Sequence, residues 1–267
     1  MYLADYHTHS TLSPDSTIPL EALCENAVRL GLREVCITDH WNLAEQNGAL
    51  ALSPFPWQPA LEQWAALRER YAGRLELRLG LEVGNGQLDD ALAARTLDLP
   101  QLDFAIGSIH NLSEAYRHRG AYSAALRVTT AEEGTALLAD YMQELWSLSR
   151  TGNFDVMGHI LYPLRYLPPE FGLTLAPWQD VLVDLLKNLI AGGRGIEFNT
   201  KGGGVEEYVP LLELYRSLGG EVLTFGSDAH QVEQIGCHLA EAYELAKAAG
   251  FRYFTVYRGR TPEFVRL

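Results

Sequence analysis

The chain has 267 residues and carries 21 Lys and Arg against 34 Asp and Glu, a formal net charge of −13, which argues against a nucleic-acid partner because phosphate backbones are bound by basic surfaces. Hydrophobic residues make up 47% of the chain, which excludes a disordered protein and supplies a large core. No apolar stretch approaches the roughly 18 residues needed to cross a bilayer and no basic, apolar leader is visible, so we expect a cytoplasmic protein without a membrane segment.

Short apolar runs alternate with stretches of helical periodicity, which predicts an α/β fold. Their length is that of parallel strands covered by helices. In chain order, seven runs predict strands, at residues 2–7, 34–38, 77–83, 104–109, 156–160, 195–199 and 221–226. The chain length and this alternation favour one domain over residues 1–267, with an α/β barrel as the natural match.

Several of the helices between these strands have readable ends. Pro19 and Gly31 bracket the first, and Thr130 caps another that begins after it. Further helices are predicted between Pro177 and Gly192 and over 232–249, before a final apolar run at 253–257.

Three long connections, at 41–59, 111–129 and 161–177, each follow a predicted strand. In a parallel barrel this places them on the face where active sites are built, although ordinary surface decoration is the alternative.

Potential metal ligands gather at the predicted strand ends. Six of the eight histidines and three carboxylates lie there: His7, His9, His40, His110, His159, His230, Asp15, Glu82 and Asp228. On extended chain, the i, i+2 spacing of His7 with His9 and of Asp228 with His230 points both side chains of each pair to one side. A mixed rim of imidazoles and carboxylates suits zinc, iron or manganese. His118 and His238 fall outside this pattern and are expected to be solvated.

The residues around these ligands resemble the ordered motifs of the polymerase and histidinol phosphatase (PHP) superfamily, and above all its monofunctional histidinol-phosphate phosphatases. The matching segments are Asp5-Tyr6-His7-Thr8-His9-Ser10, Thr38-Asp39-His40, Gly80-Leu81-Glu82-Val83, Gly107-Ser108-Ile109-His110, Gly158-His159-Ile160 and Gly226-Ser227-Asp228-Ala229-His230. The resemblance implies a distorted, TIM-like (β/α)7 barrel with three divalent metal ions at the carboxyl ends of its strands.

Carried over residue by residue, the resemblance implies three ligand sets. One ion would take His7, His9, Glu82 and Asp228; a second would share Glu82 with His110 and His159; the third would take Asp15, His40 and His230. The sequence departs from the pattern at Asp15, where a histidine is common in the phosphatase branch. Asp39 is a candidate acceptor that would orient an imidazole.

The resemblance also implies an activity, the metal-dependent hydrolysis of a phosphate monoester. The expected reaction is the hydrolysis of L-histidinol phosphate to L-histidinol and phosphate, a step of histidine biosynthesis. The expected nucleophile is a metal-bridging hydroxide that attacks phosphorus in line. Arg165 is the first choice for the phosphate, and Asp228 and His230 are candidate proton donors beside a metal-bound water. Further substrate contacts are expected from Arg117, Tyr116, Asn199 and Lys201, and the amine and imidazole are expected to meet Glu170, Glu197, Trp41, Tyr116 or Tyr166.

Two other hypotheses for the function stay open. A phosphodiesterase or nucleotide phosphatase of the same superfamily would use the same rim, and a non-catalytic module would use the ions for stability alone. In the main reading the partner is a small phosphate ester, and the protein is a monomer or a small homo-oligomer.

Overall fold

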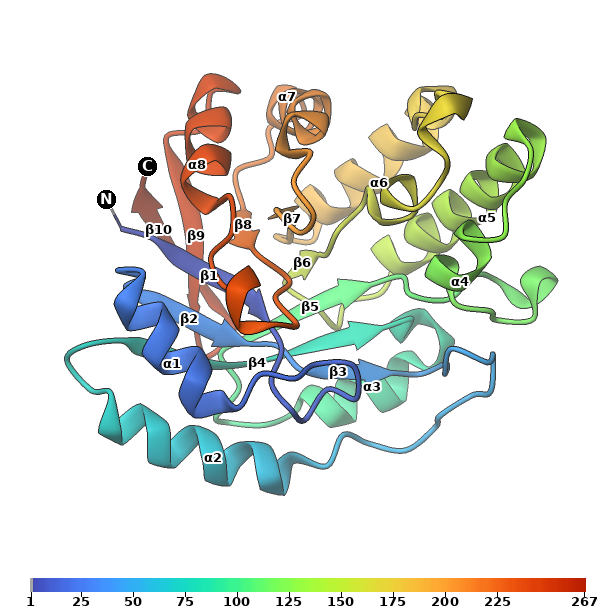
Figure 1. Ribbon diagram of the computed structural model, residues 1–267. Helices are drawn as coiled ribbons and strands as arrows, with labels where there is room; N and C mark the ends of the chain where they lie inside the picture. The colour runs from blue at the N-terminus through green and yellow to red at the C-terminus, as the bar shows by residue number, and fades with distance from the viewer. Residues whose placement is uncertain (1) are drawn as a thin grey trace.

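A computed structural model describes residues 2–267 as a nearly closed parallel barrel with helices on its outside (Figure 1). Its seven strands follow one another in the sheet: β1 (Ala4–Thr8), β2 (Glu34–Ile37), β4 (Glu76–Gly84), β5 (Phe104–Ser108), β6 (Val156–Met157), β7 (Gly195–Asn199) and β8 (Leu223–Gly226). The last strand meets the first, because the Asp228 N–H donates to the His7 carbonyl and the His9 N–H to the Ala229 carbonyl. All seven predicted strands and the predicted α/β barrel are confirmed.

Helices cover the outer face of the barrel: α1 (Leu20–Arg29), α2 (Trp57–Arg70), α3 (Asp90–Leu97), α4 (Ala121–Ala125), α5 (Ala131–Ser149), α6 (Gln179–Ala191), α7 (Val209–Ser217) and α8 (Leu239–Ala248). The predicted ends are largely correct. Thr130 caps α5 by accepting a hydrogen bond from the Glu133 N–H at 3.2 Å, and α6 ends at Gly192. None of the helices between residues 2 and 267 is long and apolar enough to cross a membrane.

Two predicted segments differ in the structure. The helix expected over 232–249 is broken, because Gly236 and His238 both adopt positive φ (68° and 54°) between a short 3-10 helix at Val232–Gln234 and α8. The connection expected at 41–59 starts with a short strand instead, β3 (His40–Asn42), which pairs with β4.

A C-terminal hairpin closes the amino end of the barrel. Its strands β9 (Tyr253–Arg258) and β10 (Thr261–Arg266) are antiparallel. The ring of Tyr257 lies 4.9 Å from that of Phe104, which in turn lies 5.0 Å from the ring of Tyr6. The Gly259 N–H donates to Asp103 just before β5. With this end filled, a site has to lie at the carboxyl ends of the strands.

Candidate metal centre

The structure brings all nine predicted ligand side chains together at the carboxyl ends of the strands. They come from β1 and the loop after it, from the start of β3, from β4, and from the segments after β5, β6 and β8: His7, His9, Asp15, His40, Glu82, His110, His159, Asp228 and His230. Six of them are buried, and of the other three the side chains of His40 and His230 are only 10% and 13% exposed. Side chains that lie far apart in the sequence therefore share one small volume.

Glu82 stands at the centre of the group and is fully buried. Its Oε2 lies 3.3 Å from His7 Nε2 and 3.6 Å from His9 Nε2. Its Oε1 lies 3.1 Å from His110 Nε2 and 2.8 Å from His159 Nε2. Oε2 also lies 2.6 Å from His40 Nδ1. Each carboxylate oxygen thus faces its own group of imidazoles, as a carboxylate shared by two cations requires.

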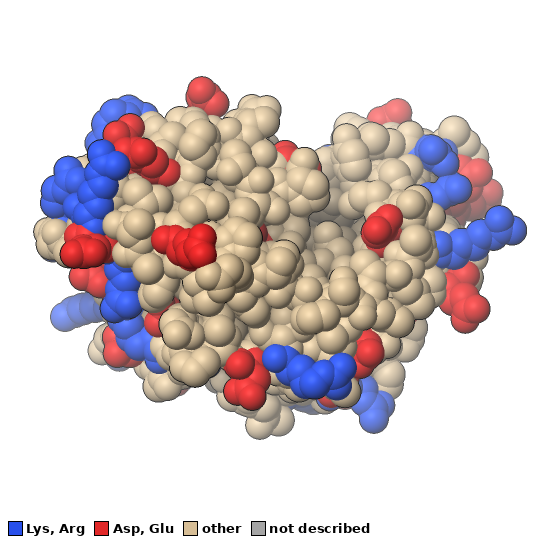
Figure 2. Space-filling view, turned by 90° about the horizontal axis from the view of Figure 1, so that it is seen from below, with Lys and Arg blue, Asp and Glu red and all other residues tan. Residues whose placement is uncertain are grey.

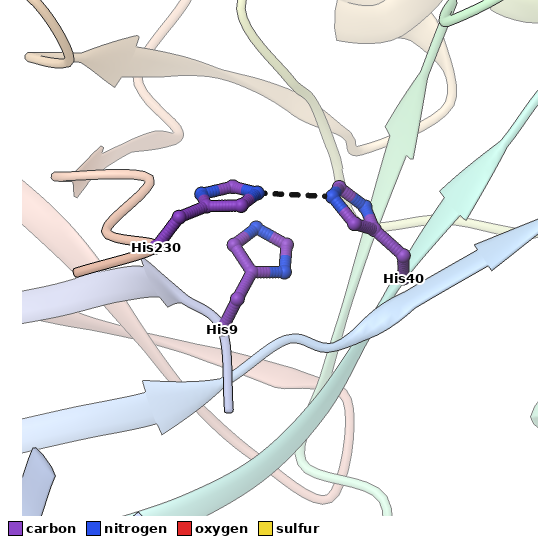
Figure 3. Close-up of side chains that lie close together, drawn as sticks. All are labelled: His9, His40 and His230. Carbon is purple, nitrogen blue, oxygen red and sulfur yellow. Dashed lines mark hydrogen bonds between the residues drawn. The ribbon is translucent and has the colours of Figure 1, made fainter. Parts of the chain in front are cut away.

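A second gathering of imidazoles lies toward the mouth of the barrel. The rings of His9, His40 and His230 converge there (Figure 3), and His40 Nε2 lies 3.2 Å from His230 Nε2. Asp15 Oδ2 lies 3.5 Å from each of these two nitrogens, and its side chain is 59% exposed. Two imidazole nitrogens and a carboxylate oxygen around one point form a set that suits a divalent cation.

Several buried atoms of the centre fit a metal ion better than they fit a hydrogen bond. His7 Nε2 and His9 Nε2 have no hydrogen-bond partner among the described residues. Burying polar atoms without a partner is costly, so such atoms call for an explanation. Imidazole nitrogens and carboxylate oxygens that face one space are the donor set of zinc, iron or manganese, and these residues therefore fit a metal centre.

The charge state of two buried carboxylates also favours a metal centre. Burial alone would raise the pKa of Glu82, but the charges of His110, His7 and His40 hold it well below the usual value. Burial alone would also raise the pKa of Asp228, and Lys201 and then His7 hold it well below. Both carboxylates are therefore anions at neutral pH, buried where positive charge must balance them.

Glu197 is a functional residue that the sequence analysis misjudged. It was expected to meet the substrate, but it is 1% exposed and its Oε1 lies 2.6 Å from His7 Nδ1. Its Oε2 accepts hydrogen bonds from the His159 N–H at 2.8 Å and from Asn199 Nδ2 at 3.1 Å. Glu197 therefore orients His7 so that Nε2 faces Glu82.

We expect Glu197→Gln to weaken zinc affinity by about 10- to 100-fold, because the amide removes the charge that makes His7 a strong donor. Titration of metal-free protein with zinc measures this affinity. Glu206→Gln, an exposed position outside the centre, is the matched control and should leave it unchanged. Equal affinity in the Glu197→Gln variant and the control would contradict the role of Glu197.

Asp39 and Asn42 also orient imidazoles, one of them indirectly. Asp39 was expected to bond an imidazole, but it accepts from the Ser13 hydroxyl at 2.7 Å, and this hydroxyl lies 3.1 Å from His9 Nδ1. Asn42 Oδ1 lies 2.7 Å from His110 Nδ1. Asp39 therefore does not bond an imidazole directly, as expected, but acts on His9 through the Ser13 hydroxyl.

Three of the predicted substrate residues lie beside the centre. Arg165 Nη2 donates to Asn199 Oδ1 at 2.6 Å, while its Nη1 is buried without a hydrogen-bond partner among the described residues and lies 4.0 Å from Asp228 Oδ2. Lys201 Nζ lies 3.1 Å from Asp228 Oδ1 and 2.9 Å from His230 Nδ1. This group forms a cationic side of the centre.

Four of the other expected contacts do not lie at the centre. Tyr116 lines a separate hollow with Arg127 and Leu137, and Arg117 is exposed. Trp41 is buried with its indole N–H bonded to the Ser53 carbonyl, and Glu170 is exposed. An acidic pocket built from Glu170 and Glu197 is therefore not present.

A cavity opens next to the centre. Besides six of the predicted ligands and Lys201, its walls contain Asn42, Gln46, Tyr162 and Tyr166. Of these four, only Tyr166 was singled out from the sequence. The sequence feature that could have indicated the other three is their position in two of the long connections that follow predicted strands.

Comparisons with known proteins identify the family and the fold. The family model described as "PHP domain" matches residues 5–201. A "Probable histidinol-phosphatase" of Deinococcus radiodurans is 29% identical, over 95% of this chain and 96% of its own length. A "Histidinol-phosphatase" of Lactococcus lactis is 26% identical, over 96% and 94%. The crystal structure of the Lactococcus lactis histidinol phosphate phosphatase with zinc, L-histidinol and phosphate shares the fold, with a TM-score of 0.84 and 23% identity over 98% of each chain. Since the family model covers well over half of the residues, the chain belongs to the PHP domain family.

Proposed function

We propose that this protein is a metal-dependent phosphatase that hydrolyses L-histidinol phosphate to L-histidinol and phosphate in histidine biosynthesis. The observation that carries the proposal is Glu82, whose two oxygens face two separate groups of imidazoles next to a buried arginine nitrogen that has no partner in the described part of the chain. The printed names of the relatives support the choice of substrate. We further propose that residues 1–267 act as one catalytic domain in the cytoplasm.

Three divalent ions are part of this proposal. His7, His9, Glu82 and Asp228 would hold one, and Glu82, His110 and His159 a second. Asp15, His40 and His230 would hold the third. When bound, such ions lower the pKa of water, polarise phosphoryl oxygens and neutralise charge during in-line displacement.

The residues of the chain itself bind and orient the phosphate. Arg165 Nη1 has no hydrogen-bond partner within residues 2–267 and is held in place because Asn199 and Tyr208 fix Nη2, so it can donate to a phosphate oxygen without rearrangement. The ammonium group of Lys201 adds a second donor. Asp228 and His230 stand within hydrogen-bond distance of Lys201 and are the candidates that hold the proton for the leaving alkoxide.

The distribution of charge supports a small substrate. Figure 2 shows one face of the molecule, on which Lys and Arg are mixed with Asp and Glu and form no continuous track. The net charge of −13 disfavours a long nucleic-acid substrate, which needs a basic track along its backbone.

The test is phosphate release from L-histidinol phosphate by purified protein, with elemental analysis of the same sample. We expect two to three divalent ions per chain, activity that chelation removes, and recovery when zinc or manganese is returned. Metal at that level without turnover of L-histidinol phosphate would contradict the substrate, and a nucleotide and phosphodiester panel would then identify another one. Turnover that survives complete metal removal would contradict the mechanism.

A further inference from the structure

A cavity of about 680 Å³ lies outside the barrel, between the connection 161–177 and the helices α6 and α7. These two helices are neighbours in the outer layer (Figure 1). Among residues 2–267, none lines both this cavity and the one beside the metal centre. Glu207 is the only charged residue that lines it, and leucines and prolines form most of its walls, so we call it the apolar cavity. Mostly apolar cavities of roughly 300–1,000 Å³ are typical of sites for small molecules.

One wall of the apolar cavity is the back of a segment whose front faces the metal centre. In a 3-10 helix, such as the one at Tyr162–Arg165, side chains three residues apart lie on the same side. On the front, Tyr162 lines the cavity beside the metal centre, and Arg165 Nη1 lies 4.0 Å from Asp228 Oδ2. On the back, three leucines at this spacing line the apolar cavity: Leu161, Leu164 and Leu167. The position of Arg165 therefore depends on what packs behind it.

The opposite wall also reaches Arg165. Its Nη2 donates to the hydroxyl of Tyr208 at 3.3 Å, and Tyr208 is buried. Glu207 and Pro210, just before and after this tyrosine in the chain, line the apolar cavity. A molecule that fills the cavity thus contacts the segments on both sides of this hydrogen bond.

The charges around the apolar cavity favour a cation. All of its lining residues belong to two segments, 161–182 and 205–214. The one basic residue of these segments, Arg165, is directed at the metal centre, and its side chain is only 13% exposed. Every exposed charged side chain on them is acidic: Glu170, Asp180, Glu206, Glu207 and Glu213. Such a distribution of charge attracts cations and repels anions.

We propose that the apolar cavity is a regulatory site for small molecules that have an apolar body and an ammonium group at one end, and that its occupant strengthens the binding of phosphate through Arg165. The apolar body would lie against the leucines, and the ammonium group at the rim near Glu207. An occupant adds contacts behind residues 161–167, where the side chains now face a void, and so holds Arg165 in the position that faces the metal centre. The effect on phosphate rests on the proposed function, whereas the binding of the amine does not.

Calorimetric titration tests the site with three probes that share a phenyl ring and a four-carbon chain: phenylbutylamine, phenylbutanol and phenylbutyrate. The metal-loaded protein is titrated in phosphate buffer, so that phosphate occupies the metal centre. We expect one amine per chain, bound about 5-fold more tightly than the carboxylate or better, with the alcohol between them. A carboxylate that binds as tightly as the amine would overturn the cationic class of ligand.

Two variants place the binding in the apolar cavity. Ala176→Phe puts a ring into the cavity from an exposed position and should raise the dissociation constant of the amine by about 10-fold or more. Ala66→Phe, at an exposed position on α2, is the matched control and should leave it unchanged. Glu207→Gln, also exposed, should raise the constant of the amine by about 2- to 5-fold and that of the alcohol by less than about 2-fold, and it keeps the test decisive if Ala176→Phe fails to fold.

The effect on Arg165 is measured as the dissociation constant of inorganic phosphate, by calorimetry with and without saturating phenylbutylamine. We expect the amine to lower this constant by about 5-fold, the lower end of the usual coupling between two sites, in the wild type and not in Ala176→Phe. Equal binding of the amine to the wild type and Ala176→Phe would overturn the site. An unchanged constant for phosphate would overturn its regulatory role. Protein that meets both expectations but releases no phosphate from any ester would contradict the proposed function instead.

Discussion

Glu82→Gln should lower kcat/KM for L-histidinol phosphate by about 10²- to 10³-fold, the scale seen when one strong electrostatic contact to a transition state is removed. The amide keeps the shape of the side chain but offers one oxygen in place of two and carries no charge. Glu82 Oε1 and Oε2 each face a different group of imidazoles, so either orientation of the amide turns an NH2 group toward one of them, and both lose the anionic charge. Steady-state kinetics and elemental analysis should show the loss of turnover together with the loss of at least one ion per chain.

Glu76→Gln is the matched control for this change. Glu76 is on the same strand, β4, but at its other end, with a side chain that is 56% exposed. The control should keep both metal content and activity. A Glu82→Gln protein that retains its full metal content and most of its activity would show that the two groups of imidazoles do not share this carboxylate.

The strands were predictable from the sequence because both of their faces are buried. Strands of a parallel barrel carry side chains toward the interior and toward the helices, so each reads as a short run with few charges. β5 and β8 are buried at every position. β6 was predicted over five residues and pairs over only two, because the chain turns away after Met157 to place His159.

The last helix could not be predicted with its break. Residues 232–249 are compatible with a helix, and Gly236 alone lowers helix stability by only about 1 kcal/mol. In the structure, the Gly236 N–H donates to Asp5 Oδ2, a contact with β1 that lies 231 residues earlier in the chain. Tertiary contact thus overrides the local preference.

The metal ligands of the candidate site could be predicted from the sequence, but the residues that orient these ligands could not. His7 and His159 could be recognised as candidate ligands because a histidine at the carboxyl end of a parallel strand lies at the mouth of the barrel. The orientation of the His7 ring depends on Glu197, which the sequence analysis assigned to the amine or imidazole of the substrate. Its contact with His7 spans 190 residues, and spacing along the chain does not encode such a pairing.

The opposite end of the barrel predicts the second large effect, which is on stability. Glu34, at the start of β2, is fully buried, and its carboxylate accepts hydrogen bonds from Tyr2, Tyr6, Arg78 and Arg258. Glu34→Gln would remove the buried counter-charge of Arg78 and Arg258 and leave them only their exposed acidic neighbours, Glu76 and Glu263. Removing one partner from a buried ion network costs about 3–5 kcal/mol, so we expect a loss of that order in the free energy of unfolding and a fall in Tm of roughly 6–20 °C.

Thermal unfolding and kinetics of the same variant test this together, since Glu34 lies at the end of the barrel remote from the metal centre. The kcat/KM of the folded Glu34→Gln protein should stay within about 2-fold of the wild type. Glu21→Gln is the control, because it removes an exposed ion pair with Arg70, and such pairs contribute about 0–1 kcal/mol. A Glu34→Gln variant no less stable than this control would contradict the importance of the network.

The contribution of Glu34 to the free energy of unfolding should decrease at acidic pH. Burial alone would raise the pKa of Glu34, but hydrogen bonds from Arg258, Tyr2 and Tyr6 lower it below its usual value. In the native state the carboxylate therefore stays ionised at a pH where the unfolded chain already binds a proton. Its stabilisation is present above the unfolded pKa, about 4.3, and is lost as the pH falls through the lower folded value. The difference in Tm between wild type and Glu34→Gln should thus be constant from about pH 6 to pH 8 and shrink below about pH 4, whereas a difference that grows on acidification would mean that Glu34 is buried in its neutral form.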